Sequence, residues 1–362
     1  MRMGRAGLVG ALLMMTACTS GGAVATTEPT TTREPTIGAS TTIASTTSAS
    51  TTTVTPATTL RGASLPEIQD IEDAGALQID TSGNADWVTV AGDSAWLANV
   101  GRGITRYDLG TGDMVGEIET NDICLAMDEG FGSLWAGDCV DNSLLRIDVA
   151  TGELVATIRL PSALPSESSV AVGDDGVWVL SQGAQPDLVR IDPATNEVAE
   201  TFPAPSGATA ARYGDGSLWI TRAHAGQLLR VDPATGDELA VIDVAPESTF
   251  LAFGEGGVWT MGSTGEVVRV DPATNSVVAS IPTGGQVDHG DVAVGGGYVW
   301  ARISESLFAQ IDPATNTVLS RYGPPSEGSG GIDADDQAVW VSDFLGQILW
   351  RLPLGSPPDS SG

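Results

Sequence analysis

The chain has 362 residues, of which 16 are basic and 46 are acidic, and its formal net charge is −30 at pH 7. Every basic residue is an arginine. A surface with this excess of negative charge repels phosphate backbones, so the sequence predicts no nucleic-acid partner.

The N-terminus carries a targeting signal. Arg2 and Arg5 precede the apolar run GLVGALLMM, which is too short to span a bilayer but has the length of a signal-peptide core. We therefore predict a signal peptide over residues 1–17. The segment MTACTS (15–20) resembles the lipobox of bacterial lipoproteins, and this resemblance implies that Cys18 becomes a lipid-modified first residue. Because Met15 replaces the usual leucine, secretion without an anchor is the alternative.

Threonine and serine make up most of residues 26–59, which contain no aromatic residue. Such a segment buries too little apolar surface to offset the entropy of ordering. We predict a disordered stalk over residues 18–63, with the lipid as the only membrane contact, and a disordered tail over residues 355–362. The protein would then lie outside the cytoplasm, on the outer surface of the cell membrane.

A short phrase recurs about every 40 residues through the remainder of the chain. Its copies are RYDLGTG (106–112), RIDVATG (146–152), RIDPATN (190–196), RVDPATG (230–236), RVDPATN (269–275), QIDPATN (310–316) and a degraded RLPLGS (351–356). The aspartate can accept hydrogen bonds from the backbone amides that follow it, and the final Asn or Gly suits a left-handed conformation. The phrase is therefore predicted to be a hairpin turn between two strands, without a chemical role.

Each repeat reads as four short antiparallel strands, with a tryptophan on the second. These tryptophans, predicted to pack between repeats, are Trp96, Trp135, Trp178, Trp219, Trp259, Trp300 and Trp340. Seven such repeats predict an all-β, seven-bladed β-propeller over residues 64–354. The last repeat lacks a fourth strand, whereas a spare strand, GALQID (75–80), precedes the first. We expect this N-terminal strand to complete the C-terminal blade and close the ring.

The arginine two places before the repeated aspartate is expected to form exposed ion pairs.

Cys124 and Cys139 flank a predicted hairpin whose turn lies midway between them. Cysteines that face each other across neighbouring strands of an extracytoplasmic protein favour a disulfide over a metal or redox site.

The repeats resemble those of the YVTN-type propeller family, as in LLRIDVATGELVATI (144–158). The turns GDDGVW (173–178) and GDGSLW (214–219) also resemble those of the virginiamycin B lyase family, in which a magnesium ion and a histidine base act. That family carries Glu-x-His-Gly before an inner strand. Here VDHGDVAVGGG (287–297) aligns His289 and Gly290 with this motif but has Val287 in place of the glutamate, so the lyase set is incomplete.

Propeller geometry places two classes of loop on one face: leading loops, which precede the first strand of a blade, and middle loops, which join its second and third strands. They vary between blades, and we call the surface they form the mouth face. Its candidate residues in leading loops are Asn84, Asp86, Asn121, Asp122, Glu167, Thr209, Glu247, Asp288 and His289. Those in middle loops are Asn99, Arg102, Asp138, Asp141, Arg222, His224, Arg302 and Asp343.

The sequence therefore predicts a monomeric, non-catalytic binding protein that recognises a protein partner or a small ligand at the mouth face. The binding set is Arg102, Asp122, Asp138, Asp141, Arg222, His224, Asp288, His289, Arg302 and Asp343. The alternative is a metal-dependent lyase or hydrolase built around His289. No cofactor is expected; a calcium or magnesium ion at Asp138, Asp141 and Asn142 is a weaker hypothesis.

Overall fold

The computed structural model describes residues 64–355, except residues 82, 183–185, 286–289 and 327. The predicted signal peptide, Cys18, the stalk, nearly all of the C-terminal tail, Asp288 and His289 therefore lie outside the described residues. Within the described part, the helical structure is the single 3-10 turn η1 (Ala223–Ala225), and no helix is long and apolar enough to cross a membrane.

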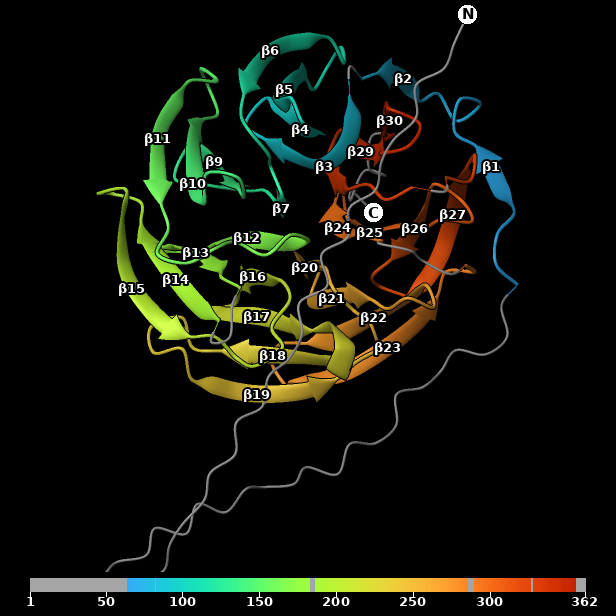
Figure 1. The fold of residues 1–362 in the computed structure, drawn as a ribbon. Coiled ribbons are helices and arrows are strands. Elements are labelled where there is room, and N and C mark those ends of the chain that lie inside the picture. Colours follow the sequence, from blue (N-terminus) through green and yellow to red (C-terminus); the bar gives the residue numbers. More distant parts are fainter. Residues whose placement is uncertain (1–63, 82, 183–185, 286–289, 327, 356–362) are drawn as a thin grey trace, which may run out of the picture. The chain divides into compact units, whose positions relative to one another are not determined.

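Seven β-sheets surround a central axis, which confirms the predicted seven-bladed β-propeller (Figure 1). The first three blades consist of β3 (Asn84–Ala91), β4 (Ser94–Val100), β5 (Gly103–Asp108) and β6 (Met114–Glu119); β8 (Asp128–Gly130), β9 (Ser133–Asp138), β10 (Ser143–Asp148) and β11 (Leu154–Arg159); and β12 (Ser168–Val172), β13 (Val177–Leu180), β14 (Asp187–Asp192) and β15 (Glu197–Pro203). The short strand β7 (Leu125–Ala126) pairs in parallel with β12.

The next three blades have the same order, with the first strand nearest the axis. They consist of β16 (Ala211–Gly214), β17 (Ser217–Arg222), β18 (Gln227–Val231) and β19 (Glu238–Asp243); β20 (Leu251–Gly254), β21 (Gly257–Met261), β22 (Glu266–Asp271) and β23 (Ser276–Pro282); and β24 (Val292–Gly295), β25 (Tyr298–Arg302), β26 (Phe308–Asp312) and β27 (Thr317–Gly323).

The seventh blade takes its outermost strand from the N-terminal side of the domain. It contains β28 (Ile332–Ala334), β29 (Ala338–Asp343) and β30 (Ile348–Pro353), and β2 (Leu77–Asp80) pairs antiparallel with β30. This confirms the predicted closure of the ring. The sequence did not predict β1 (Ile68–Asp70), which adds to blade 6 as a parallel fifth strand on β27.

The repeated phrase forms the predicted hairpin turns between third and fourth strands. In the second blade, Asp148 Oδ1 accepts hydrogen bonds from the amides of Ala150 and Thr151 at 3.0 and 2.8 Å. The closing residues have positive φ, for example 59° at Asn196 and 76° at Gly152. The aspartate carboxylate and this left-handed residue together fix the turn.

The seven repeated tryptophans are fully buried, as expected for residues that pack between blades. In six blades an arginine on the third strand stacks over the tryptophan of the second strand; these arginines are Arg106, Arg146, Arg190, Arg230, Arg269 and Arg351.

Among these arginines, Arg190 and Arg230 form the predicted ion pairs with exposed acidic residues, and several of the six also bind the next blade, which was not predicted. Arg146 Nη1 donates to Asn196 Oδ1 at 2.8 Å and to a backbone carbonyl of the same turn. Arg230 in blade 4 and Arg269 in blade 5 repeat this pattern, and Arg351 Nε donates to the carbonyl of Leu109 at 2.7 Å across the ring closure. The repeated phrase therefore also joins neighbouring blades.

Cys124 and Cys139 form a disulfide, with their Cα atoms 5.9 Å apart. The bond joins the segment that leads into β8 to the residue after β9, and the amide of Cys124 also donates to the carbonyl of Gly137. It therefore fixes the leading loop of the second blade to its middle loop.

Candidate functional site

A cavity of about 370 Å³ opens among the leading and middle loops of the mouth face. We call it the mouth cavity. Its lining comes from blades 3 to 6 and consists of Ser166, Glu167, Thr209, Ala223, His224, Glu247, Thr249, Phe250, Met261, Gly262, Ser263 and Gly290. Four of these residues, Glu167, Thr209, His224 and Glu247, are among the mouth-face candidates derived from the sequence.

Backbone contacts hold the loops of the mouth cavity together. The amide of Glu247 donates to the carbonyl of Ala223 at 2.9 Å, which joins the leading loop of blade 5 to η1 in blade 4. Thr209 Oγ1 accepts a hydrogen bond from the Ala223 amide at 3.1 Å and donates to the carbonyl of Thr221. Gly226 ends η1 with φ of 62°, a conformation that suits glycine. The two loops therefore present their side chains from fixed backbones.

The side chains of His224 and Glu247, which both line the mouth cavity, lie close enough to form an ion pair. His224 Nδ1 lies 2.9 Å from Glu247 Oε2, and the two side chains are 92% and 48% exposed. Below them, Phe250 and Met261 are buried apolar lining residues. Apolar side chains together with a polar lining that includes two glutamates suit a ligand group with a cationic or hydrogen-bonding end.

A pair of aromatic rings crosses the central channel next to the mouth cavity. A bulge in β3 between Ala85 and Val88 brings Trp87 against Phe250, with ring centroids 4.6 Å apart. Trp87 lines a second cavity, whereas Phe250 lines the mouth cavity.

The same bulge carries Asp86 to the mouth end of the channel. Burial, followed by the charges of Glu167, Asp122 and Asp291, raises the pKa of Asp86 from 3.8 to about 7. This shift marks a concentration of negative charge around the mouth.

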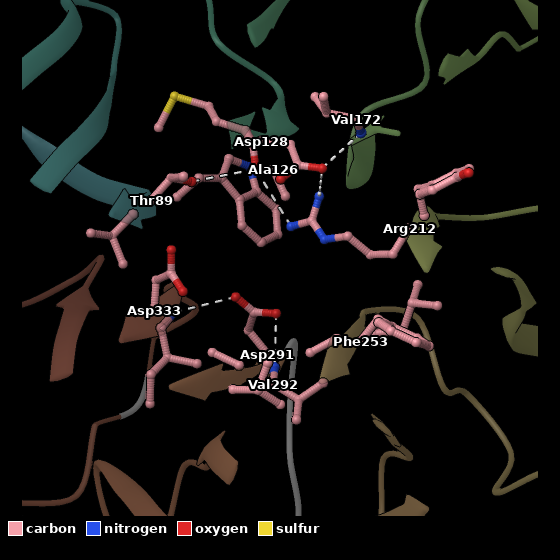
Figure 2. Close-up of a pocket in the computed structure, with 18 residues that line it drawn as sticks. Thr89, Ala126, Asp128, Val172, Arg212, Phe253, Asp291, Val292 and Asp333 are labelled. Carbon is pink, nitrogen blue, oxygen red and sulfur yellow. Dashed lines mark hydrogen bonds and ion pairs between the residues drawn. The ribbon is translucent and has the colours of Figure 1, made fainter. Parts of the chain in front are cut away.

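The second cavity, of about 200 Å³, lies in the channel and is lined by first strands from all seven blades. Figure 2 shows Arg212 directed toward Asp128, with Asp291 and Asp333 across the cavity from them. Arg212 Nη1 is 3.8 Å from Asp128 Oδ2. We did not predict this charged cluster, which we call the channel cluster.

Each carboxylate of the channel cluster fastens its blade to the next one. Asp128, Asp291 and Asp333 accept hydrogen bonds from the amides of Val172, Ile332 and Val90 at 2.8, 3.2 and 2.8 Å. Burial is the main cause that raises the pKa of Asp291 to about 6 and that of Asp333 to about 7. Burial also raises the pKa of Asp128, opposed by Arg212. These contacts assign the channel cluster a structural role at three blade boundaries.

Asp138, Asp141 and Asn142 shape their own loop. Asp138 is buried and accepts hydrogen bonds from the amides of Val140 and Asp141 at 3.0 and 3.1 Å, and Asp141 Oδ2 accepts one from Asn121 Nδ2 at 2.6 Å. Asn142 binds backbone groups with both ends of its amide. Across the described part of the chain, no group of three or more His, Cys, Asp or Glu residues is arranged to hold a metal ion.

Arg302 lies in the interior instead of on the mouth face, which corrects the expectation for this residue. It is 2% exposed, and its guanidinium donates to the carbonyls of Ser342, Ile303, Leu307 and Gly328 and to the hydroxyl of Ser326. Burial lowers its pKa from 12.5 to about 10. Arg302 therefore acts as an internal hydrogen-bond donor between blades 6 and 7.

The other predicted residues are spread around the mouth face. Arg222 Nη2 is 2.6 Å from Glu238 Oε1, Asp343 Oδ1 accepts from the amide of Gly346 at 3.0 Å, and Arg102 is exposed in the middle loop of blade 1. Asp122 is half-buried beside the disulfide. None of these four residues lines the mouth cavity.

No protein-family model and no curated protein matches the chain. Similar solved structures include the WD40 repeats of RRP9, at 13% identity and a TM-score of 0.64, covering 80% of this chain and 100% of that one. The β-propeller domain of Cps50 (Swd1) from Myceliophteria thermophila has 14% identity and a TM-score of 0.64, covering 77% and 100%. BamB from Moraxella catarrhalis has 13% identity and a TM-score of 0.53, covering 76% and 85%. At these identities the similarity establishes the fold alone.

Proposed function

We propose that this chain is a binding protein whose mouth cavity receives a cationic group of a protein partner. The observation that carries the proposal is the mouth cavity itself, which non-repeating loops of four blades build around Phe250 and Met261. Because propellers host many activities, the fold adds no support for any particular ligand.

The acidic residues in and near the mouth cavity indicate that the partner is positively charged. Glu167 and Glu247 line the mouth cavity, Asp86 and Asp122 lie near enough to interact electrostatically with one another, and the whole chain has a net charge of −30. A basic partner would be attracted over distances up to about 10 Å at moderate ionic strength. A small cationic ligand would use the same contacts and is the competing occupant.

Site-specific photo-crosslinking of the full chain tests this proposal. A photoreactive residue replaces Ser263, which lines the mouth cavity, and in a matched control it replaces Val155, which is 51% exposed on the outer strand of blade 2. We expect a discrete protein adduct from position 263 in intact cells, reduced at least fivefold by Glu247→Gln. Equal adducts from both positions, or none from position 263, would refute the proposal.

We further propose that Cys18 is lipid-modified and holds the propeller outside the cytoplasm. The support is the lipobox-like MTACTS segment and the Cys124–Cys139 disulfide, since disulfides persist in oxidising compartments. Metabolic labelling with a radioactive fatty acid should mark the wild-type chain and leave Cys18→Ser unmarked. If both remain unlabelled, the chain is not lipid-anchored.

A further inference from the structure

The groove between the outermost strands of blades 5 and 6 contains an extended segment of the chain itself. Ser64, Leu65 and Pro66 line it together with the end of β23 and the start of β27. Leu65 lies so close to Gly284 that a Cβ there would collide with it, and the carbonyl of Pro66 accepts a hydrogen bond from Arg321 Nε at 3.1 Å. Immediately afterwards the chain becomes β1 and pairs with β27.

The next groove around the ring, between blades 4 and 5, has equivalent walls. We call it the outer groove; it is a cavity of about 500 Å³. Residues 241–243 and 275–277 line it, and the strand registers align them one for one with residues 280–282 and 316–318 of the occupied groove.

The outer groove also has the features of a strand-binding surface. In the described sheets, β23 is the end strand of blade 5, so one of its edges has no strand partner. Leu239, Val241 and Val278 expose 55%, 49% and 44% of their surface beside it. An unpaired edge next to exposed apolar side chains is a surface to which an extended peptide can add as a further strand.

We propose that the outer groove binds an extended segment of another protein, in which an apolar-proline pair fills the cavity and the following residues add in parallel to β23. The mode is the one that the chain already uses one blade further on, with Leu65 and Pro66 followed by β1. A second copy of this chain is not the occupant, because its own copy of this segment is held against blade 6.

Charge indicates the chemistry of the partner segment. Asp243 and Glu266 line the outer groove, whereas the equivalent positions one blade further on hold the uncharged Pro282, which lines the occupied groove, and Leu307. A segment that fits the outer groove should therefore carry a basic side chain where this chain has Glu67 or Asp70. This surface is separate from the mouth cavity, so the inference does not depend on the proposed function.

The test is the binding of a fluorescent peptide to the full chain, measured by fluorescence anisotropy. The probe has the sequence of residues 63–71 with Glu67→Lys and Asp70→Lys. We expect saturable one-to-one binding that weakens with added salt, and at least threefold weaker binding of the unchanged acidic sequence. Binding at least tenfold weaker is expected for the chain carrying Val241→Arg, because this variant places bulk and positive charge in the outer groove.

Val155→Arg is the matched control, because Val155 is a similarly exposed valine on the outer strand of blade 2. It should bind the probe as wild type does, and circular dichroism establishes that both variants are folded. Asp243→Asn is a second variant at an exposed position. It should make the affinity for the peptide depend less on salt concentration. Absence of saturable binding, equal loss with Val155→Arg, or wild-type binding by Val241→Arg would overturn the proposal. The proposal would also be overturned if sedimentation revealed a dimer that Val241→Arg abolishes, because the occupant of the outer groove would then be a second copy of this chain.

Discussion

The arginine that joins neighbouring blades gives a quantitative prediction at Arg269. Its guanidinium lies 4.9 Å from the centre of the Trp259 ring and donates to the carbonyl of Pro313 and to Asn316 Oδ1, at 2.6 and 3.0 Å, both in the next blade. Arg269→Met keeps an apolar stem over the ring and removes the charged donors. We take about 1 kcal/mol for each cross-blade hydrogen bond, because the group is partly exposed, and about 0.5–1 kcal/mol for the cation–π contact. The expected loss is therefore about 2.5–3 kcal/mol of unfolding free energy.

Urea denaturation of the full chain, followed by tryptophan fluorescence, measures this loss. Blade 6 supplies the control, because Gln310 occupies the equivalent place, and Gln310→Met should cost less than about 0.5 kcal/mol. Asn316→Gly isolates one contact: glycine adopts the φ of 54° readily, so only the Oδ1 acceptor is lost, for about 1 kcal/mol. Equal losses from Arg269→Met and Gln310→Met would refute the cross-blade role.

Three further predictions concern the interior and the disulfide. The pKa values of Asp86, Asp291 and Asp333 are raised, so the folded state binds protons more tightly than the unfolded state between about pH 4 and 7. The free energy of unfolding should therefore fall as pH rises through this window. Thermal unfolding at pH 5.0 and 7.5 measures the change, and Asp333→Asn should make the thermal midpoint depend less on pH. Arg302→Met should cost about 3–5 kcal/mol because it leaves buried carbonyls without donors, whereas Arg102→Met should cost less than about 0.5 kcal/mol; a small loss at Arg302 in urea denaturation would contradict its internal role. Replacing Cys124 and Cys139 with serine removes a link of sequence separation 15, worth about 3 kcal/mol, and a reducing agent should lower the thermal midpoint of wild type but not of this variant.

The blades were predictable because their determinants are local and repeat. The aspartate turn and the buried tryptophan each need only a few neighbouring residues, and the period supplies the rest of the architecture. The spare strand over residues 75–80 identified the ring closure because the last repeat lacked its partner. By contrast, β1 has no counterpart in the other repeats, so no periodic signal indicated it.

The mouth cavity was predictable only in part, because burial depends on distant packing. Arg302 and Arg102 both belong to middle loops of the predicted topology, yet one is internal and the other is exposed. A signal was present: Arg302 is two residues after Trp300, and that position is buried in every blade, as Ala98, Gly137, Leu180, Thr221, Met261, Arg302 and Ser342.

The channel cluster had a comparable signal. Asp128, Arg212 and Asp333 pair with the repeated tryptophan from the first strand of their blades, where blades 3, 5 and 6 have alanine. Blade 1 has Thr89 there, so a charged residue at a position that the other four blades fill with alanine or threonine indicates the channel lining. That Asp128 and Arg212 come together depends on the curvature of the whole ring, which no single repeat encodes.

The closure of the ring by β2 also sets an order for biosynthesis. Leu77 pairs with Arg351, so β2, which is made before blade 1, remains without its partner until β30 has been made. Blades 1 to 6 can each form their four-stranded sheets from contiguous chain, but the final contact has a very high sequence separation and can form only once β30 has been made. A ribosome that stalls within the last blade would therefore release an open arc with two unpaired edges, a species prone to aggregation and to proteolysis.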